Sequence, residues 1–487
     1  MKQDIAFSSA TTLVRALRER RLGSLELLDH FLARIARHNP AINAIAATNF
    51  EAARKQAKVR DRTRRADNAQ GALHGLPMTV KESFDVAGLP STWGLPAMRG
   101  NIAQASATAV QRLERAGAVV FAKTNVPVLL ADWQSFNPVY GTTVNPWDAS
   151  RTPGGSSGGA AAALAAGLTG LEIGSDIGGS IRNPAHCCGV YGHKPSYGIV
   201  PTAGHALPGH TVALDINVAG PMARSAADLL LALKVLAGPD ERQASSWSLK
   251  LRPARQRSLA EFRVAVVSDS KVAPVDDSVR TQLDALARFL EVGKVRVSRA
   301  ARPALPEAEV YTLYVHLLRA ATSPIQADPD TFARMVADTG RLRPDDRSYQ
   351  AEQLRGNTMR HRDWLIACNR RQQLMHAWTE FFGSHDLLLC PAAPVPAFLH
   401  DHAGLRATRT VEVNGRPRPV NEHLFWAGYS GMFHLPSTVA PLGRSPAGLP
   451  IGVQIIGPPG ADLACIRFAR LLEQAYYRFE PPAGFDH

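Results

Sequence analysis

Two serines in glycine-rich runs are the residues of this chain whose type and spacing could do chemistry. Ser156 lies in the run PGGSSGG that starts at Pro153, and Ser180 ends the run DIGGS. Glycine permits positive φ and close approach of another group to the backbone. An alanine-rich stretch joins the two runs, and we expect a buried helix at Ser157–Ala166 followed by a strand at Leu171–Ile173. A flexible Gly/Ser linker is the alternative, but linkers do not enclose an uncharged, alanine-rich helix.

Acyl transfer by serine fits these residues. The DIGGS run would point backbone N–H groups at a developing oxyanion, and Ser180 could attack a carbonyl carbon. A serine nucleophile needs a base, and Lys81 directly follows the short apolar strand Met78–Val80. Burial lowers the pKa of a lysine toward a value useful to a base, although a lysine at a strand end is more often a solvated cap. A lysine is considered because the histidines lie in turn-like or apolar contexts, where a structural role is commoner. It would accept the proton of Ser180 directly or through another hydroxyl. The histidines weighed are His193, His205, His210 and His434.

Two other motifs fit less well. Residues 154–158 match the G-x-S-x-G elbow of α/β-hydrolases, with Ser156 as nucleophile. That elbow requires a strand just before the serine, whereas the preceding NPWDASRTP contains two prolines and suits a loop. The run His400-Asp401-His402 lacks a third ligand at a recognisable spacing, so we expect a surface loop there and no metal.

Longer motifs resemble those of the amidase signature family. They are GLPMTVKES around Lys81, NPWDASRTPGGSSGG ending at Gly159, GSDIGGSIRNPAHCCGVYGHKPSYG from Gly174, GPMARSAADL from Gly220, and GLPIGVQIIGPP near the C-terminus. The resemblance covers nearly the whole chain and is weakest at about 300–379. It implies a hydrolase that cleaves an amide C–N bond through an acyl-enzyme, without a cofactor.

The same resemblance implies roles for individual residues. Ser180 would be the nucleophile, Ser156 a bridging serine after a cis peptide bond, and Lys81 the base. The implied oxyanion donors are the backbone N–H groups of Ile177, Gly178, Gly179 and Ser180. Asp176 and Arg182 are expected to hold the loop behind the reacting groups.

The resemblance also suggests where the substrate lies. Leu130, Ala131 and Trp133 occupy the positions where an acyl-pocket wall is expected, with Trp93 and Phe136 nearby. These side chains favour a small hydrophobic or aryl amide, with ester or carbamate side activity, and each could equally belong to the core.

The order of helices and strands predicts an α/β fold. A helix at Thr108–Ala116 precedes a strand at Val119–Lys123, and this alternation recurs along the chain. The family resemblance implies a large mixed, twisted β-sheet covered by helices on both faces. We find no repeats or long linker, so we expect a single domain over residues 1–487, with a helical, motif-poor segment at about 300–379 that contributes to the pocket. Arg182, Pro184 and Lys194 are expected in loop-rich surroundings.

The composition and net charge of the chain restrict the kinds of partner that we expect. The net charge of +13 is spread over dispersed arginines without interleaved aromatic residues, which argues against nucleic acid. The chain has no apolar run that would span a bilayer and no signal-peptide pattern at its start, so we expect a cytoplasmic protein without a membrane partner. Five scattered cysteines are interpreted as reduced thiols. The expected partner is a small-molecule amide, and a homodimer is compatible with the sequence.

Two rival functions stay open at this point. A glutamine-hydrolysing amidotransferase subunit in a tRNA-linked complex would share this core and would give the basic charge a purpose. A non-catalytic binding protein on the same fold is the more remote alternative.

Overall fold

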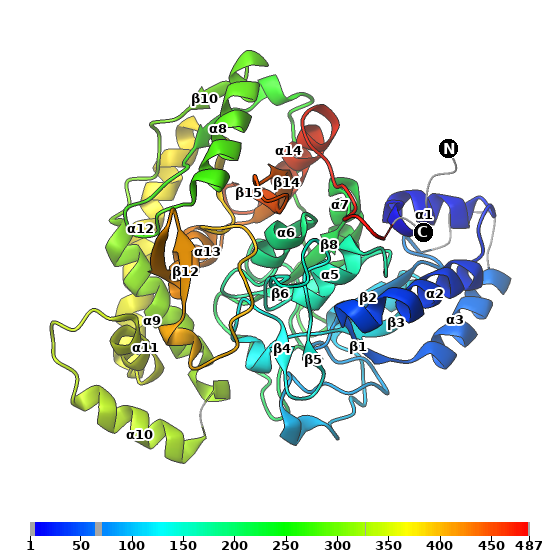
Figure 1. The fold of residues 1–487 in the computed structure, drawn as a ribbon, viewed down its shortest axis with the longest axis horizontal. Helices are drawn as coiled ribbons and strands as arrows, with labels where there is room; N and C mark the ends of the chain where they lie inside the picture. Colours follow the sequence, from blue (N-terminus) through cyan, green and yellow to red (C-terminus); the bar gives the residue numbers. More distant parts are fainter. Residues whose placement is uncertain (1–4, 64–70, 327, 486–487) are drawn as a thin grey trace.

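A mixed sheet of eight strands runs through the centre of the protein (Figure 1). The computed structural model describes residues 5–63, 71–326 and 328–485. The strand order is β10-β9-β11-β15-β14-β7-β8-β6, parallel from β10 to β11 and antiparallel from there to β6. The strands are β6 Glu172–Asp176, β7 Tyr191–Lys194, β8 Val218–Ala223, β9 Arg263–Val266, β10 Arg296–Ser298, β11 Leu387–Pro391, β14 Ser437–Arg444 and β15 Pro450–Ile456.

A smaller sheet lies beside the β6 edge. It has the order β1-β3-β2, with β1 at Ile45–Thr48, β2 at Pro77–Lys81 and β3 at Val119–Thr124. The Thr79 N–H on β2 donates to the Leu171 carbonyl, just before β6, at 3.3 Å. The end of β2, which carries Lys81, is therefore held next to the central sheet. Two short hairpins complete the described strands: β4 Phe136–Asn137 with β5 Gly141–Thr142, and β12 Thr410–Val413 with β13 Arg416–Pro419.

Helices cover both faces of the central sheet. Val439 on β14 packs with apolar residues of α5 (Gly158–Ala165) and α6 (Arg182–Cys188). The opposite side of β14 meets α14 (Asp462–Ala475), which itself packs against α7 (Ala226–Leu236). Successive side chains of a strand point to opposite faces, so a sheet covered on both sides needs continuously buried strands. All seven residues of β15 are buried, as this arrangement requires. The mixed α/β fold expected from the sequence is confirmed.

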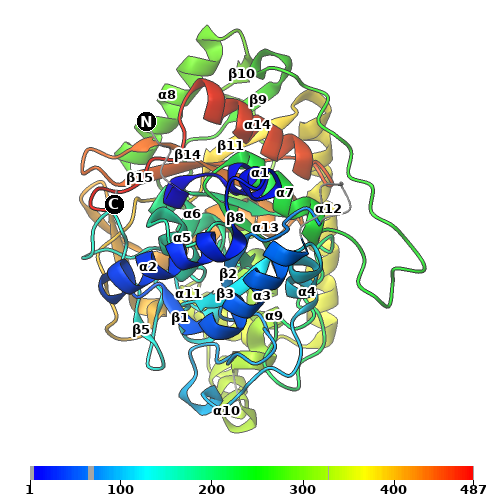
Figure 2. The same ribbon diagram turned by 90° about the vertical axis from the view of Figure 1, so that its right-hand side faces the viewer.

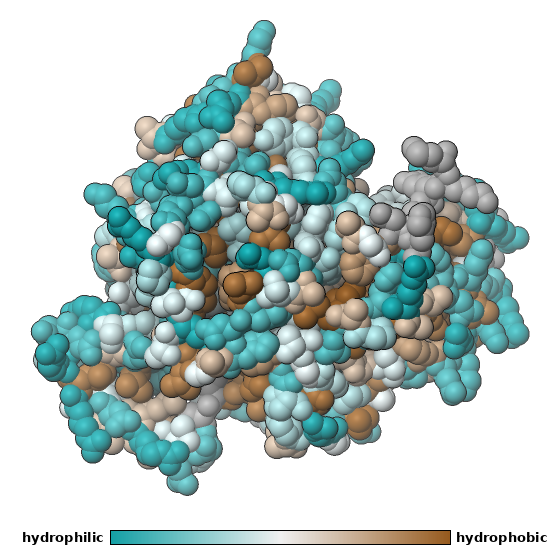
Figure 3. Space-filling view, in the orientation of Figure 1, coloured by the Kyte–Doolittle hydropathy of each residue, from teal (hydrophilic) through white to brown (hydrophobic). Residues whose placement is uncertain are grey.

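The remaining helices surround these layers (Figures 1 and 2). They are α1 Ala10–Arg18, α2 Ser24–Ile42, α3 Phe50–Arg62, α4 Thr108–Arg115, α8 Asp277–Val292, α9 Glu307–Gln326, α10 Pro329–Gly340, α11 Tyr349–Asn357, α12 His361–Ser384 and α13 His423–Gly431. The segment at about 300–379 is helical, as expected. Its α10 lies at the lower left of Figure 1 and exposes Phe332 and Val336, and hydrophobic residues are visible on this rim in Figure 3.

One expectation about local structure is wrong. The run after Ser180 is not loop-rich, because Arg182 and Pro184 lie in α6 and Lys194 ends β7. Gly192 serves packing in β7, because a Cβ there would lie 2.7 Å from a methyl of Ile181. Gly189 ends α6 and Gly198 lies in a turn, both with positive φ. The Lys- and Arg-rich sequence from Asn49 to about Asp67 also predicts a helix with a solvated face. It is α3, which has Asn49 as its N-cap and ends at Arg62, and residues 64–67 lie outside the described part of the chain.

The structure also allows the helices to be compared with the thickness of a membrane and the state of the cysteines to be read. Every helix in residues 5–63, 71–326 and 328–485 is too short or too polar to cross a bilayer. All five cysteines are free thiols; four are buried and Cys368 is partly buried.

Candidate active site

Lys81 is the centre of the site and is completely buried at the end of β2. Its Nζ donates to the Ser156 Oγ at 2.6 Å and to the Ser175 Oγ at 2.9 Å. Burial lowers the pKa of Lys81 to about 7, although the carboxyl groups of Asp176 and Glu172 act in the opposite direction. The lysine is therefore poised between its protonated and neutral forms near neutral pH, next to a serine hydroxyl.

Ser156 lies in a tightly packed loop at the start of α5. The peptide bond between Gly155 and Ser156 is cis, as the family resemblance implies. A Cβ on Gly155 would lie 2.4 Å from the Asp132 carbonyl oxygen, and one on Gly159 would lie 2.4 Å from the Asn125 nitrogen. Only glycine lets these backbones approach so closely. No strand immediately precedes Ser156, so the hydrolase elbow is absent, and the buried alanine helix is confirmed as α5.

Ser180 lies on a loop that is tied to the Ser156 loop. The Ser157 N–H donates to the Ser180 carbonyl at 3.1 Å. Ser180 is 7 % exposed and lines a cavity, whereas Ser156 is 1 % exposed behind it. The structure thus brings Lys81, Ser156 and Ser180 together from β2, the α5 entry and the β6–α6 loop, and only Ser180 faces the space where a substrate would lie.

A buried ion pair holds the Ser180 loop. The Asp176 carboxylate accepts hydrogen bonds from the Arg182 guanidinium at 2.8 and 3.0 Å and from the Ile181 N–H at 3.0 Å. Burial would raise the pKa of Asp176, but Arg182 and the N–H donors outweigh it and hold that pKa well below its usual range. Arg182 also donates to the Ala427 carbonyl and Ser430 on α13 and to Gln454 on β15. The loop is therefore anchored to α13 and to the central sheet.

The backbone N–H groups of this loop differ in what they contact. The Gly179 N–H donates to the Asp176 Oδ1 at 2.9 Å, so this group is already satisfied within the protein. In residues 5–63, 71–326 and 328–485, no acceptor engages the N–H groups of Ile177, Gly178 or Ser180. Three of the four expected oxyanion donors therefore have no acceptor among the described residues, whereas the carboxylate that holds the loop engages the fourth.

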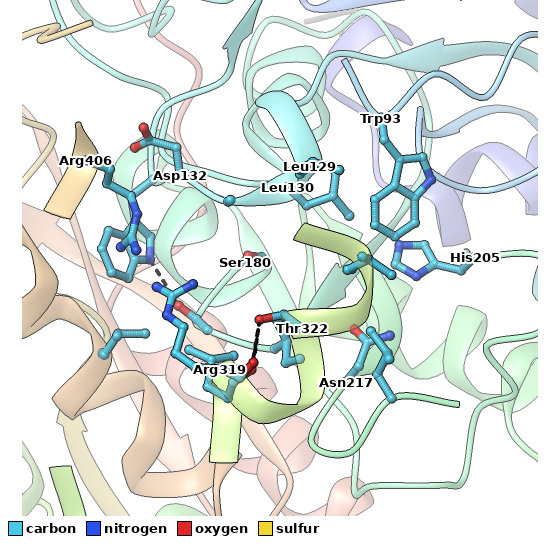
Figure 4. Close-up of a pocket in the computed structure, with 18 residues that line it drawn as sticks. Trp93, Leu129, Leu130, Asp132, Ser180, His205, Asn217, Arg319, Thr322 and Arg406 are labelled. Atoms are coloured by element: carbon cyan, nitrogen blue, oxygen red, sulfur yellow. Dashed lines mark hydrogen bonds between the residues drawn. The ribbon is translucent and has the colours of Figure 1, made fainter. Parts of the chain in front are cut away.

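The cavity in front of Ser180 is lined by most of the side chains expected there. Leu130, Ala131 and Trp133 lie on its wall together with Trp93 (Figure 4). Trp133 is fixed against the Ser180 loop, because its Nε1 donates to the Gly178 carbonyl at 3.0 Å. Phe136 does not line the cavity and stacks on His402 with ring centroids 3.9 Å apart. It lies behind the wall, under Arg409, which pairs with the lining residue Asp132.

Several cavity residues were missed by the sequence analysis. The motif-poor helix α9 contributes Leu318, Arg319 and Thr322, and Arg406 comes from the short 3-10 helix Arg406–Thr408 (Figure 4). His205 also lines the cavity; burial lowers its pKa to about 3 and its Nδ1 has no hydrogen-bond partner among the described residues. The expected contribution of the segment at about 300–379 to the pocket pointed to α9, whereas no motif marks Arg406, and His205 was expected to have a structural role.

Two of the other histidines considered in the sequence analysis form contacts within the fold. His193 is buried between Thr438 and Asp462, at 2.9 and 3.1 Å, and the His434 Nε2 lies 2.9 Å from Asp215. These contacts agree with the structural role expected of them.

Comparisons with known proteins agree with this fold and site. The family model described as Amidase matches residues 26–466. An indoleacetamide hydrolase of Bradyrhizobium diazoefficiens is 32% identical over 470 residues, covering 94% of this chain and 84% of that protein. A glutamyl-tRNA(Gln) amidotransferase subunit of Deinococcus deserti is 32% identical over 501 residues, covering 98% of each. A solved amidase structure superposes with a TM-score of 0.77 at 29% identity, covering 96% of this chain and 99% of the other.

The family match and the similar proteins place the chain in a class of enzymes that hydrolyse amide bonds. The family match spans nearly the whole chain, so the protein belongs to the amidase signature family.

Proposed function

We propose that the protein is a serine hydrolase that cleaves an amide C–N bond through an acyl-enzyme, with Ser180 as nucleophile. The observation that carries this proposal is the completely buried Lys81, whose Nζ lies 2.6 Å from the Ser156 Oγ behind a cavity lined by Ser180. A lysine held near its neutral form can act as a base without a histidine.

The first half of the reaction forms the acyl-enzyme. Neutral Lys81 accepts the Ser156 proton while Ser156 accepts the Ser180 proton, and the Ser180 Oγ bonds to the carbonyl carbon. The N–H groups of Ile177, Gly178 and Ser180 stabilise the oxyanion that develops. The C–N bond then breaks, and the proton returns from Lys81 through Ser156 to the departing nitrogen.

The second half releases the acid. Water gives its proton to Ser156, and Ser156 gives one to Lys81, as the water oxygen bonds to the acyl carbon. The Ser180 Oγ leaves and takes a proton back through the same relay. Every residue ends in its starting form, so no cofactor is needed.

Substitution of Ser180 tests this assignment. Ser180→Ala should lower kcat/KM by more than about 10³-fold, because the acyl-enzyme cannot form. A fluorophosphonate serine probe should label the wild-type chain and leave the variant unlabelled. Labelling of the Ser180→Ala protein at another serine, with activity retained, would overturn the proposal.

A glutamine-hydrolysing role is the second candidate, supported by the near full-length similarity to a glutamyl-tRNA(Gln) amidotransferase subunit. It predicts ammonia release from glutamine and the need for a partner protein. The purified chain should be assayed with anilides, aliphatic amides, carbamates, esters and glutamine. Hydrolysis of anilides without turnover of glutamine favours the small-molecule amidase.

A further inference from the structure

Two arginines of the cavity wall have no carboxylate partner. Arg319 on α9 is 5 % exposed, and Arg406 is partly buried beside it. In the described part of the chain, neither guanidinium forms a salt bridge with an Asp or Glu. The two arginines and Tyr349, which they share, are called the cationic wall below.

The hydrogen bonds of the cationic wall compensate only part of its positive charge. Both guanidinium groups donate to the Tyr349 hydroxyl, Arg406 at 3.0 Å, and Arg406 also donates to the Asn421 side chain at 2.7 Å. The Arg319 Nε is buried without a hydrogen-bond partner among the described residues. Burial would raise the pKa of Tyr349, but the two guanidinium groups outweigh it and lower that pKa. One phenol oxygen can balance at most one of the two positive charges.

Nearby carboxylates are committed to other groups. Asp132, on the same cavity wall, accepts from Arg409 at 2.6 Å, and its charge also helps to raise the pKa of Arg406 against the effect of burial, without a direct bond. Arg319, whose pKa burial lowers, is therefore the more poorly compensated of the two arginines. Glu352 on α11 is held by His316 at 2.6 Å and by Arg355 at 3.0 Å. A buried cation without a counter-ion costs free energy, which a bound anion would offset through charge-assisted hydrogen bonds. The missing anion is therefore best supplied by a ligand.

The cationic wall lies next to the reacting groups. The Arg406 guanidinium packs over Trp133, 5.1 Å from the ring centroid, and Trp133 is bonded to the Gly178 carbonyl. In Figure 4, Ser180 is drawn between Arg319 and Arg406 on one side and Trp93 and His205 on the other. A ligand with its carbonyl carbon at Ser180 would thus meet cations at one end and aromatic rings at the other.

We propose that the substrate carries a carboxylate on its acyl part, bound by Arg319 and Arg406, and an apolar or aryl amine part at the Trp93 end. This inference rests on the proposed amidase function and narrows its substrate class to monoamides of dicarboxylic acids. The acyl part is assigned to the cationic wall because Trp133, against which Arg406 packs, lies where the acyl-pocket wall is expected.

A matched pair of substrates tests the charge. Glutaryl 4-nitroanilide and pentanoyl 4-nitroanilide have acyl chains of equal length, and only the first ends in a carboxylate. The wild-type enzyme should prefer the glutaryl compound by about 10- to 100-fold in kcat/KM, the range expected for charged hydrogen bonds. Free glutarate should inhibit competitively. Equal rates, or a preference for the pentanoyl compound, would overturn the inference.

Variants separate recognition from a structural role. Arg319→Gln should lower kcat/KM for the glutaryl compound more than for the pentanoyl compound, so that most of the preference is lost, and it should weaken glutarate inhibition. Arg319→Lys should retain part of the preference. Arg347→Gln is the matched control, because Arg347 is an exposed cation that contacts Glu352 outside the cavity, and its preference should stay that of the wild type.

Thermal stability, measured as Tm with and without glutarate, provides a second test. Because Arg319 is a buried cation without a counter-ion, Arg319→Gln should leave Tm unchanged or raise it, and glutarate should raise the Tm of the wild type more than that of the variant. Loss of stability together with equal loss of both activities would mean that Arg319 is structural and would overturn the inference. Failure of the amidase proposal itself is distinguishable, since the enzyme would then hydrolyse neither anilide and Ser180 would not react with the fluorophosphonate probe.

Discussion

The glycine-rich loops around Lys81 and the cationic wall across the cavity differ in how their residues are held. The loops at Ser156 and Ser180 are fixed by backbone contacts too close for a side chain and by the buried Asp176–Arg182 pair. The cationic wall is made of long side chains that share one phenol and keep an unpartnered Nε among the described residues. Under the two proposals, proton transfer depends on a rigid backbone, whereas selection of the substrate depends on side chains of separate elements.

The largest expected effect is on the loop side of this comparison. Lys81→Met removes the proposed base and should lower kcat/KM by about 10²- to 10⁴-fold. In the wild type, kcat/KM should rise with pH and level off above about 7, because burial lowers the pKa of Lys81 to about 7 and only neutral lysine accepts a proton. A pH–rate profile of both proteins checks this. If Lys81→Met shows the same rise of kcat/KM with pH, the titration belongs to another group.

The ion pair behind Ser180 should be the next most sensitive point. Arg182→Met leaves the Asp176 carboxylate buried without its partner and should lower the free energy of unfolding by about 3–5 kcal/mol. Denaturant titration measures the loss. Arg115→Met is the control, since Arg115 pairs with Glu241 at the exposed surface and its loss should cost at most about 1 kcal/mol. Equal costs for the two variants would show that the loop does not depend on this pair.

A single methyl group probes the close backbone contacts. Gly159→Ala places a Cβ 2.4 Å from the Asn125 nitrogen, so α5 or β3 must shift. We expect about 1–3 kcal/mol of lost stability and a fall in kcat that exceeds any change in KM, because Ser156 lies at the start of α5. A variant with wild-type stability and kcat would mean that the loop tolerates displacement.

The smallest effect on stability is expected from a substitution in α10, which follows the cavity-lining helix α9 and has no buried residue. Gly340→Ala meets nothing within 4 Å and should raise the free energy of unfolding by about 0.4–1 kcal/mol through the unfolded chain's lost freedom. Thermal unfolding and kcat/KM together make the measurement. A large loss of activity here would place α10 within the machinery of the site and weaken the contrast between the two regions.

Much of the reacting centre could be predicted from local sequence. The glycines around Ser156 and Ser180, the alanine helix and the apolar strand before Lys81 each leave a short-range pattern, since close packing restricts residue type within a few positions. The prediction of loop-rich surroundings after Ser180 was wrong, because α6 and β7 depend on packing such as that of Gly192 against Ile181, which local sequence does not reveal. A contact between distant segments leaves no periodic signal in either one.

The sequence alone was enough to identify the family and the α/β class, because long motifs match those of the amidase signature family, and that resemblance implied the three residues proposed to move the proton. Tertiary structure alone decided that Lys81 is buried at 2.6 Å from Ser156, that Gly179 is bonded to Asp176, and that Arg319 and Arg406 face the same cavity as Ser180. Burial, pKa and charge balance depend on segments far apart in the chain, and only folding brings those segments together.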